Sequence, residues 1–252
     1  RPVPHERDDP GQITWEWKDN ALGKGLWYYG RLLRHRTMMV SLECLPYFYA
    51  LSPNYGDPEN DFLEQYHQGT ISMEARAVYE TLLNQGAMDS LSLRREAHLR
   101  STGSEGRFNH AIDTLQGELK ILPVGISQAG SWHYAYIYDL VTRHFPELQD
   151  LARPISEAEA RSHLLLTCLE TLGAVDISEI SRLFGWEPPF LQKAIDTLVV
   201  SGRVKAAMSS PCGPSAMTAS ARPQASACCA STRSPRHIMR MARADPSSWN
   251  RS

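Results

Sequence analysis

The sequence predicts a mainly α-helical protein with small antiparallel β-hairpins, an α+β fold in which one small unit occurs twice. The pentapeptide AIDTL stands at residues 111–115 and again at 194–198. Each copy lies in the last of three successive helical patterns, and a strand-like apolar run follows each copy. Because further matches keep the same order in both halves, an internal duplication explains them better than chance. These matches pair residues 74–76 with 159–161 and residues 86–89 with 173–176.

The first unit is predicted over residues 71–150. Apolar residues at helical spacing, with Ser72 as N-cap and Gly86 as stop, indicate its first helix. A short second helix is expected over 89–99 and a third over 107–119. Two strand-like runs, KILPVGI and WHYAYIYDL, follow and are joined by turn residues, so they predict a hairpin.

The second unit is predicted over residues 155–205. Its first helix begins at Ser156, its second is capped by Asp176, and its third begins with two prolines and ends at Gly202. In both copies we expect the Ala, Ile and Leu of the pentapeptide to pack inward and its aspartate to lie on the outer face. The order helix, helix, helix, hairpin is typical of winged-helix domains, so the sequence predicts tandem winged-helix units.

Both ends of the chain break this pattern. Residues 206–252 contain ten Ala, ten Ser and five Pro without periodicity, so we expect them to be disordered and the second wing to be truncated near residue 205. Two interpretations of this segment stay open, a basic disordered tail and a shifted reading frame of a GC-rich gene. Residues 1–14 are polar and Pro-rich, and we expect a disordered remnant of a longer N-terminus.

Residues 15–70 are predicted to form a partial N-terminal unit, which could be the remnant of a preceding winged helix. The segment 15–36 interleaves basic and aromatic side chains, a combination that suits phosphate contact and base stacking. The alternative is a helix over about 21–35 that buries its leucines and Tyr29. An apolar helix or strand, a turn-rich stretch and a short acidic helix are expected after it.

Exposed polar and basic side chains around the predicted third helices are the candidate DNA contacts. Asn and Gln can bond adenine edges, Arg can bond guanine, and Arg and Lys neutralise phosphates. The alternative is an ordinary solvated surface. The candidates are Arg94, Arg95 and Arg100 on the second helix of the first unit; Arg107, Asn109, His110 and Gln116 on its third helix; Gln128, Ser131 and His133 in its wing; Gln192 and Lys193 in the second unit; and Lys24, Arg31, Arg34 and Arg36 near the N-terminus.

Other classes of protein find no support in the sequence. The five cysteines form no CxxC pair and the nine histidines do not cluster, so we predict no metal site and no disulfide framework, as expected for a cytoplasmic protein. No apolar run approaches the about 20 residues of a membrane span. Motifs for phosphate, dinucleotide or zinc binding and for serine hydrolysis do not occur, so we expect no cofactor and can name no catalytic residue.

Four stretches resemble one protein family. VSLECLPYFYALSPNYGDPENDFLEQY, ARAVYETLLNQGAMDSLSLRR, RFNHAIDTLQGELKILPVGI and HYAYIYDLVTRHFPEL are similar to the winged-helix proteins grouped around the AlkZ/YcaQ-like DNA glycosylases, in particular an outlying AlkZ-related branch. The resemblance spans roughly residues 15–204. It implies tandem winged helices, association with double-stranded DNA, and metal-independent excision of alkylated bases through a Gln-x-Gln or Gln-x-Asp motif. Here Gln12-Ile13-Thr14 departs from that motif at its third position, and Gln65 and Gln68 have the wrong spacing.

Two functional hypotheses follow. The first is a DNA-binding tandem winged-helix protein, with a DNA-repair glycosylase-like scaffold. The second is a non-catalytic winged-helix module that binds a protein partner. Residues up to 204 carry 19 Lys/Arg against 27 Asp/Glu, whereas the segment from Lys205 carries seven against one. An acidic body favours the second hypothesis, although local basic patches matter more than total charge.

Overall fold

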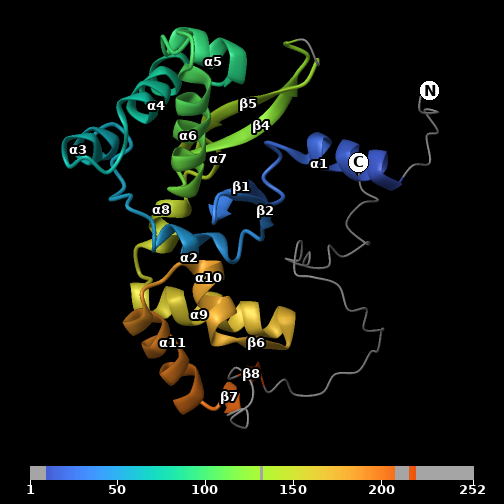
Figure 1. Ribbon diagram of the computed structural model, residues 1–252, viewed down its shortest axis with the longest axis vertical. Coiled ribbons are helices and arrows are strands. Elements are labelled where there is room, and N and C mark those ends of the chain that lie inside the picture. The colour runs from blue at the N-terminus through green and yellow to red at the C-terminus, as the bar shows by residue number, and fades with distance from the viewer. Residues whose placement is uncertain (1–9, 131–132, 208–215, 220–252) are drawn as a thin grey trace. The chain divides into compact units, whose positions relative to one another are not determined.

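The computed structural model describes residues 10–130, 133–207 and 216–219, and the chain divides into two compact units (Figure 1). Unit 1 comprises residues 1–38 and 52–151, and unit 2 comprises residues 39–51 and 152–252. Each unit combines helices with a small antiparallel sheet. This confirms the predicted α+β class.

Unit 1 places a three-stranded antiparallel sheet beside three consecutive helices. The elements up to residue 152, apart from one helix of unit 2, are α1 (Pro10–Ala21), β1 (Tyr28–Leu33), β2 (Arg36–Val40), α3 (Asp61–His67), α4 (Met73–Gln85), β3 (Met88–Asp89), α5 (Ser90–Glu96), α6 (Ser104–Gly117), β4 (Ile121–Ser127), β5 (Ala135–Leu140), α7 (Val141–His144) and α8 (Leu148–Ala152). The sheet has the strand order β3-β5-β4, and β4 forms a hairpin with β5.

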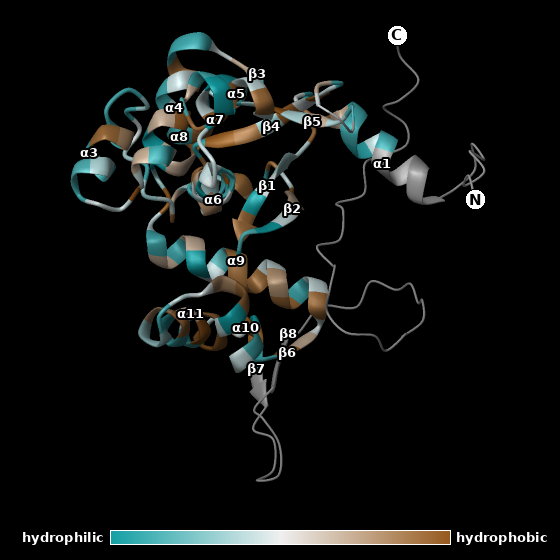
Figure 2. Cartoon of the chain, turned by 45° about the horizontal axis from the view of Figure 1, so that its top comes forward, coloured by the Kyte–Doolittle hydropathy of each residue, from teal (hydrophilic) through white to brown (hydrophobic). Residues whose placement is uncertain are grey.

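The core of unit 1 explains why these segments are helices. Val78, Leu82 and Leu115 are fully buried where α4 and α6 pack against each other. The Ser72 hydroxyl accepts a hydrogen bond from the backbone N–H of Ala75, which confirms the predicted N-cap of α4. Helix α4 ends at Gly86, whose φ of +84° is accessible to glycine at little cost. In Figure 2 strand β4 is largely brown, as expected for a strand whose first residues are buried.

The segment 21–35 is a loop and a β-hairpin, so the alternative of a helix there is wrong. Helix α1 ends at Ala21, and Gly23 and Gly25 follow with φ of +70° and +64°, outside the helical region. Strand β1 then pairs with β2 through the turn residues Arg34 and His35. The pattern of apolar residues at helical spacing was overridden by these glycines and by the burial of Tyr28 beneath α6.

Unit 2 repeats the topology of unit 1. Its elements are α2 (Leu45–Tyr49), α9 (Glu157–Leu172), β6 (Ala174–Asp176), α10 (Ile177–Phe184), α11 (Pro188–Val200), β7 (Val204–Ala207) and β8 (Ala216–Ala219). Its sheet has the order β6-β8-β7, which corresponds to β3-β5-β4. The short strands β3 and β6 each lie in one of the paired matches at 86–89 and 173–176, and the sequence reading missed both because two or three residues show no periodicity.

The second hairpin is not lost at residue 205. Strand β7 pairs with β8 from Val204 opposite Ala219 to Ala207 opposite Ala216, and β6 pairs with the other edge of β8. The truncation was predicted because the strand residues after 205 are mostly Ala, Met and Thr, which do not alternate in polarity. The remaining predicted disorder at 1–9, 208–215 and 220–252 lies outside the described residues.

The repeated pentapeptide is part of both cores. Ala111, Ile112 and Leu115 are buried in unit 1, and the corresponding three residues of α11 are buried in unit 2. This confirms the predicted inward packing. The two aspartates differ: Asp113 is half-buried and pairs with Arg31, whereas Asp196 is exposed.

Candidate nucleic-acid interface

Helix α6 presents only part of the predicted reading face. Arg107, Asn109 and His110 are exposed, as a groove-reading role needs. Arg107 lies 3.2 Å from the Glu74 carboxylate in a salt bridge, so part of its charge is neutralised. Gln116 is 3% exposed and its side chain cannot reach a base edge, so its prediction as a DNA contact is wrong. The helical turn that carries it faces β1.

Helix α5 uses one of its predicted phosphate contacts internally. The Arg94 guanidinium donates to the Leu99 carbonyl over 2.8 Å and to the Ser104 hydroxyl over 3.2 Å, so it closes the turn that leads into α6. Arg95 is exposed but forms a salt bridge with Glu96 over 2.9 Å. Arg100 is exposed in the same turn. Arg94 is therefore a positioning residue for α6, whereas Arg100 is available to solvent.

The β4–β5 hairpin carries two of its predicted contacts into solvent. Gln128 and His133 are both exposed. The backbone carbonyl of Gln128 lies 3.3 Å from Nδ1 of His133, which links the two sides of the turn. Ser131 lies outside the described residues.

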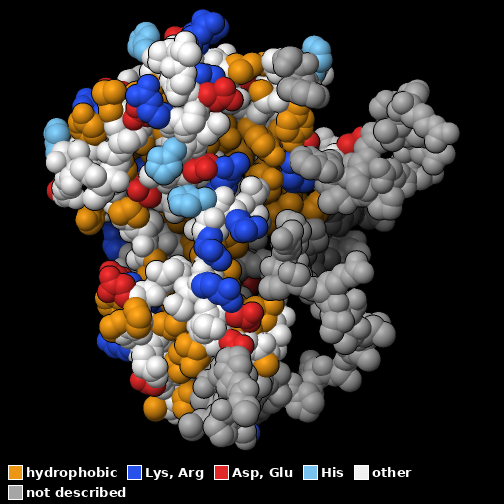
Figure 3. Space-filling model, viewed as in Figure 1, with side chains coloured by type: hydrophobic (Ala, Val, Ile, Leu, Met, Phe, Trp, Pro, Cys, Tyr) orange, Lys and Arg blue, Asp and Glu red, His pale blue; other side chains and the backbone are white. Residues whose placement is uncertain are grey.

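The β1–β2 hairpin forms a basic tip. Arg34 and His35 have φ of +52° and +54°, which is the left-handed region that two-residue hairpin turns require. Glycine and asparagine are the usual residues there, so arginine and histidine make this turn more costly. Arg34, His35 and Arg36 are all exposed, and Figure 3 shows Lys and Arg side chains gathered over this hairpin.

Arg31 anchors the hairpin. Its guanidinium forms a salt bridge with Asp113 of α6, and the Tyr28 hydroxyl donates to the backbone carbonyl of Gln116 over 3.4 Å. Arg31 thus has a partner within unit 1 while its side chain keeps 40% exposure, and its role as a DNA contact stays a prediction. The same pair neutralises the aspartate that the sequence places on the outer face of the helix.

Salt bridges separate the basic residues of unit 1 into two groups. Most of its arginines are engaged by a carboxylate of the same unit. In the part of unit 1 that the structure describes, Lys24, Arg34, Arg36 and Arg100 are exposed and form no salt bridge. Three of these four belong to the loop and hairpin between α1 and β2. Unneutralised cations concentrate at this site.

A lysine held by tyrosines lies beside the hairpin strands. The Lys18 ammonium donates to the hydroxyls of Tyr136 over 2.8 Å and Tyr134 over 3.1 Å, and it forms a salt bridge with Asp19. Burial alone would lower the pKa of Lys18, but hydrogen bonds with Asp19 and Tyr136 outweigh burial and raise it. Burial would raise the pKa of Tyr136, but the hydrogen bonds with Lys18, Tyr134 and Tyr29 together outweigh burial and lower it. The sequence gives no periodic signal for this cluster, because its residues are more than 100 positions apart.

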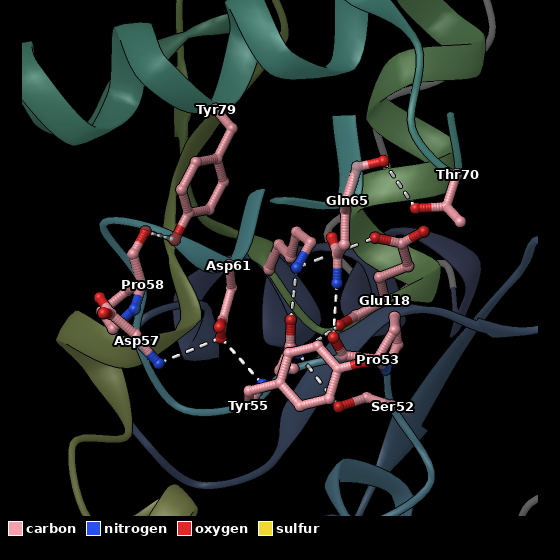
Figure 4. Close-up of polar contacts among 12 residues, drawn as sticks. Ser52, Pro53, Tyr55, Asp57, Pro58, Asp61, Gln65, Thr70, Tyr79 and Glu118 are labelled. Carbon is pink, nitrogen blue, oxygen red and sulfur yellow. Dashed lines mark hydrogen bonds and ion pairs between the residues drawn. The ribbon is translucent and has the colours of Figure 1, made fainter. Parts of the chain in front are cut away.

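A buried polar cluster fixes the loop before α3 (Figure 4). The Asp61 carboxylate accepts hydrogen bonds from three consecutive backbone N–H groups, those of Tyr55, Gly56 and Asp57, at 2.9, 2.9 and 3.1 Å. Three such donors satisfy a buried carboxylate. Asp57 and its neighbours are therefore turn residues, as the sequence predicts.

The same cluster contains Gln65, one of the two glutamines whose spacing departs from the Gln-x-Gln motif. Its amide donates to the carbonyl of Pro53, and the residue is only 2% exposed (Figure 4). Beside it, the Lys120 ammonium donates to Asn54 and lies 3.9 Å from Glu118. Burial raises the pKa of Glu118 and lowers that of Lys120. Gln65 holds the loop in place, and no solvent-facing group of it is left to contact a substrate.

Unit 2 offers a different surface. The Gln192 amide donates to Asp196 over 2.8 Å, and Lys193 is exposed on the same helix, α11. The helix also exposes apolar side chains: Phe190 is 44% and Val200 is 87% exposed. Both predicted contacts are thus on the surface, but Gln192 is already paired with an acid. On the described face of α11, Lys193 is the one cation that a phosphate backbone would meet.

Within the described residues, no group of three or more His, Cys, Asp or Glu side chains could hold a metal ion. The helices mapped over the same residues include none long and apolar enough to cross a membrane. Cys44 and Cys168 are free thiols. The sequence places His35 and Lys18 among the basic residues of segment 15–36, but it predicts neither the hairpin turn at His35 nor the contacts of Lys18 with Tyr134 and Tyr136.

The fold and the site together define an α+β protein whose two units each combine helices with a three-stranded antiparallel sheet, and whose unit 1 carries a basic hairpin. The family model described as AlkZ related matches residues 4–185. Since this match covers most of the chain, the protein belongs to the AlkZ-related family. Neither the curated proteins nor the solved structures contain a match.

Proposed function

We propose that this chain is a DNA-binding protein built from two winged-helix units in tandem, related in kind to DNA-repair glycosylases that act on alkylated bases. Two lines support the winged-helix assignment. In both units a strand between the first and second helices joins the sheet of the terminal hairpin. The third helix, α6 or α11, precedes that hairpin, as in domains that read DNA with this helix.

The observation that carries the proposal is the position of the free cations. Lys24, Arg34 and Arg36 are exposed and unneutralised on the α1–β2 segment, which packs against α6 through β1. Contacts with phosphate supply a large share of the affinity of proteins for DNA, and exposed Lys and Arg side chains without a carboxylate partner neutralise phosphates. Membership of the AlkZ-related family supports association with DNA.

The experiment measures the affinity of the full chain for duplex DNA by fluorescence anisotropy over a range of salt concentrations. The slope of log affinity against log salt is about −0.9 per phosphate contacted, so the double variant Arg34→Ala/Arg36→Ala should lower its magnitude by about 1.8. The matched control is Arg76→Ala/Arg182→Ala, which removes two arginines that already pair with glutamates and lie outside the proposed reading helices. The proposal would be rejected if both double variants lowered the magnitude of the salt slope equally, or if the parent chain did not bind duplex DNA at low salt.

The second part of the proposal, excision of an alkylated base, is tested by a separate assay. Release of an alkylated base from a labelled duplex is measured with the full chain, without added metal. No release in the presence of proven binding would leave a DNA-binding protein without this activity. No catalytic residue is assigned, because neither Gln-x-Gln nor Gln-x-Asp occurs in the sequence.

The second candidate function is protein binding by unit 2. Its support is the apolar exposure of α11, where Phe190, Val199 and Val200 reach solvent beside Asp196. Exposed apolar side chains on a helix suit a protein partner better than a phosphate backbone. Replacing Val200 by Lys should weaken a protein interaction and leave DNA affinity unchanged or slightly higher.

A further inference from the structure

The third helix of unit 2, α11, carries an exposed row of side chains along its outer face (Figure 1). The four residues of this row stand at spacings of four, three and four, and we call them the α11 stripe: Pro189, Lys193, Asp196 and Val200. This spacing keeps them on one side of the helix, opposite the residues that pack into the core of unit 2. Side chains at this spacing are the ones that pack along a second helix.

The α11 stripe is complementary to itself when two copies lie antiparallel. A twofold axis between residues 194 and 195 places residue 193 of one copy opposite residue 196 of the other, and residue 189 opposite residue 200. A lysine then faces an aspartate on both sides of the axis, and a proline faces a valine at both ends. A contact between two identical surfaces requires this kind of pattern, because each residue must suit the residue that it meets in the other copy.

Both charges of the stripe lack an ion-pair partner in the mapped part of unit 2. Its salt bridges engage Arg161, Arg182 and Arg203 but neither Lys193 nor Asp196. The Asp196 carboxylate accepts a hydrogen bond from the neutral Gln192 amide over 2.8 Å, which leaves its charge in place. The side chain at position 200 is apolar and 87% exposed, so its burial lowers the free energy. A second copy of the stripe supplies an opposite charge and an apolar contact at these positions.

The repeated unit shows that a third helix of this kind can hold another segment on its outer face. The two copies of AIDTL align α11 with α6. In unit 1, strand β1 packs against α6, and an arginine of β1 pairs with Asp113, the counterpart of the stripe aspartate. The positions after AIDTL are Gln116 and Gly117 in α6, but Val199 and Val200 in α11, where they are 39% and 87% exposed. The corresponding end of α11 is therefore apolar and open to a partner.

We propose that two copies of the chain associate through the α11 stripe, as an antiparallel pair of helices about a twofold axis. Lys193 of each copy pairs with the partner's Asp196, and Val200 packs against the partner's Pro189. One row of a 13-residue helix covers less than the about 800 Å² per partner of a standard interface, so the dimer is weak and depends on concentration. This inference rests on the second candidate function, protein binding by unit 2, and names its partner; it does not require DNA binding.

The test measures the mass of the full chain by sedimentation velocity from low to high micromolar concentration. The mass of the parent should rise from that of one chain toward that of two. Lys193→Asp puts two carboxylates on the stripe and Asp196→Lys puts two ammonium groups on it, so each variant alone should dimerise about tenfold more weakly. An equimolar mixture of the two variants should regain the parental affinity, because every carboxylate then faces an ammonium group. This recovery also shows that both variants are folded.

The control is Arg100→Asp, which makes the same change of charge at an exposed residue of unit 1 and should leave the dimer unchanged. Val200→Lys, at a side chain with little contact inside the chain, should weaken the dimer. A parent that stays a single chain at every concentration overturns the inference. So does a dimer that Val200→Lys and Lys193→Asp leave intact, an equal loss in Arg100→Asp, or a mixture that regains nothing.

The outcome for DNA is scored separately, by the anisotropy assay on the same samples. A single chain that binds duplex DNA overturns the dimer and leaves the proposed DNA binding standing. A dimer that does not bind duplex DNA leaves the α11 contact standing and rejects the DNA-binding proposal.

Discussion

Two equivalent helix caps in the repeated unit allow a controlled test of the fold. Asp89 precedes α5 and its Oδ1 accepts hydrogen bonds from the backbone N–H groups of Leu91 and Ser92, at 3.0 and 3.1 Å. Asp176 occupies the same position before α10 with similar backbone angles, but its side chain makes no capping hydrogen bond. Asp89→Ala and Asp176→Ala therefore remove the same atoms from equivalent positions, and only the first loses two hydrogen bonds.

The expected cost follows from these bonds. Replacing a capping Asp by Ala costs about 1 kcal/mol, so Asp89→Ala should lower the melting temperature of unit 1 by about 4 °C. Asp176→Ala should cost less than about 0.5 kcal/mol, as at other surface positions without a specific contact. Burial would raise the pKa of Asp89, but the hydrogen bonds from Ser92 and Leu91 outweigh burial and lower it.

A lowered pKa in the folded state gives this cap a definite pH dependence. The stabilisation is complete above the unfolded-state pKa of about 3.9 and is lost as the pH falls through the lower folded-state pKa. The difference between the parent chain and Asp89→Ala should be constant at neutral pH and shrink below about pH 4. Asp89→Asn keeps an acceptor and should retain part of the stability without that acid dependence.

Hydrogen exchange measured by mass spectrometry is the appropriate assay, because the two units need not unfold together. Peptides that cover 88–97 and 174–185 report α5 and α10 separately, and thermal unfolding followed by circular dichroism gives the global cost. Equal losses of protection in the two variants would refute the capping argument. So would a difference that persists unchanged to pH 2.

Two further predictions concern titratable groups that are buried or half-buried. Lys120→Met should destabilise unit 1 by about 3 kcal/mol, because it leaves the buried Glu118 carboxylate without its cation. Adding Glu118→Gln should restore part of the lost free energy of unfolding, measured by urea unfolding. If the second substitution restores nothing, the ion pair between Lys120 and Glu118 is contradicted. Burial lowers the pKa of His163, so unit 2 should lose stability as the pH falls below about 6.5, where the unfolded chain takes up the proton first. His163→Gln should remove this acid dependence, and an NMR titration of His163 with a midpoint above 6.5 would contradict the assignment.

Phosphate contact needs only exposed cations, which Lys24, Arg34 and Arg36 provide in the structure as it stands.

Local sequence patterns were sufficient for the elements that recur. The apolar spacing within residues 72–86 and within the two copies of AIDTL determines which face of each helix is buried, because a helix buries residues three and four apart. Capping residues placed the starts of α4 and α9, where Ser72 and Ser156 accept from the third residue of each helix. These signals need no knowledge of the rest of the chain, and the order of elements alone indicates the duplication.

Only the tertiary structure decided which polar residues are available for function. Arg31 and Asp113 are 82 positions apart in the sequence. Their salt bridge ties strand β1 to α6 and neutralises the aspartate that would otherwise repel a phosphate. In the sequence Gln116 resembles a residue that reads DNA bases, but β1 covers it in the fold. Arg34 and Arg36 look no different from Arg94 in the sequence, yet Arg94 pairs with a carboxylate and the other two do not. A residue's spacing along a helix fixes the face on which it lies, whereas its availability depends on which distant segment packs there, and that depends on the free energy of the whole fold.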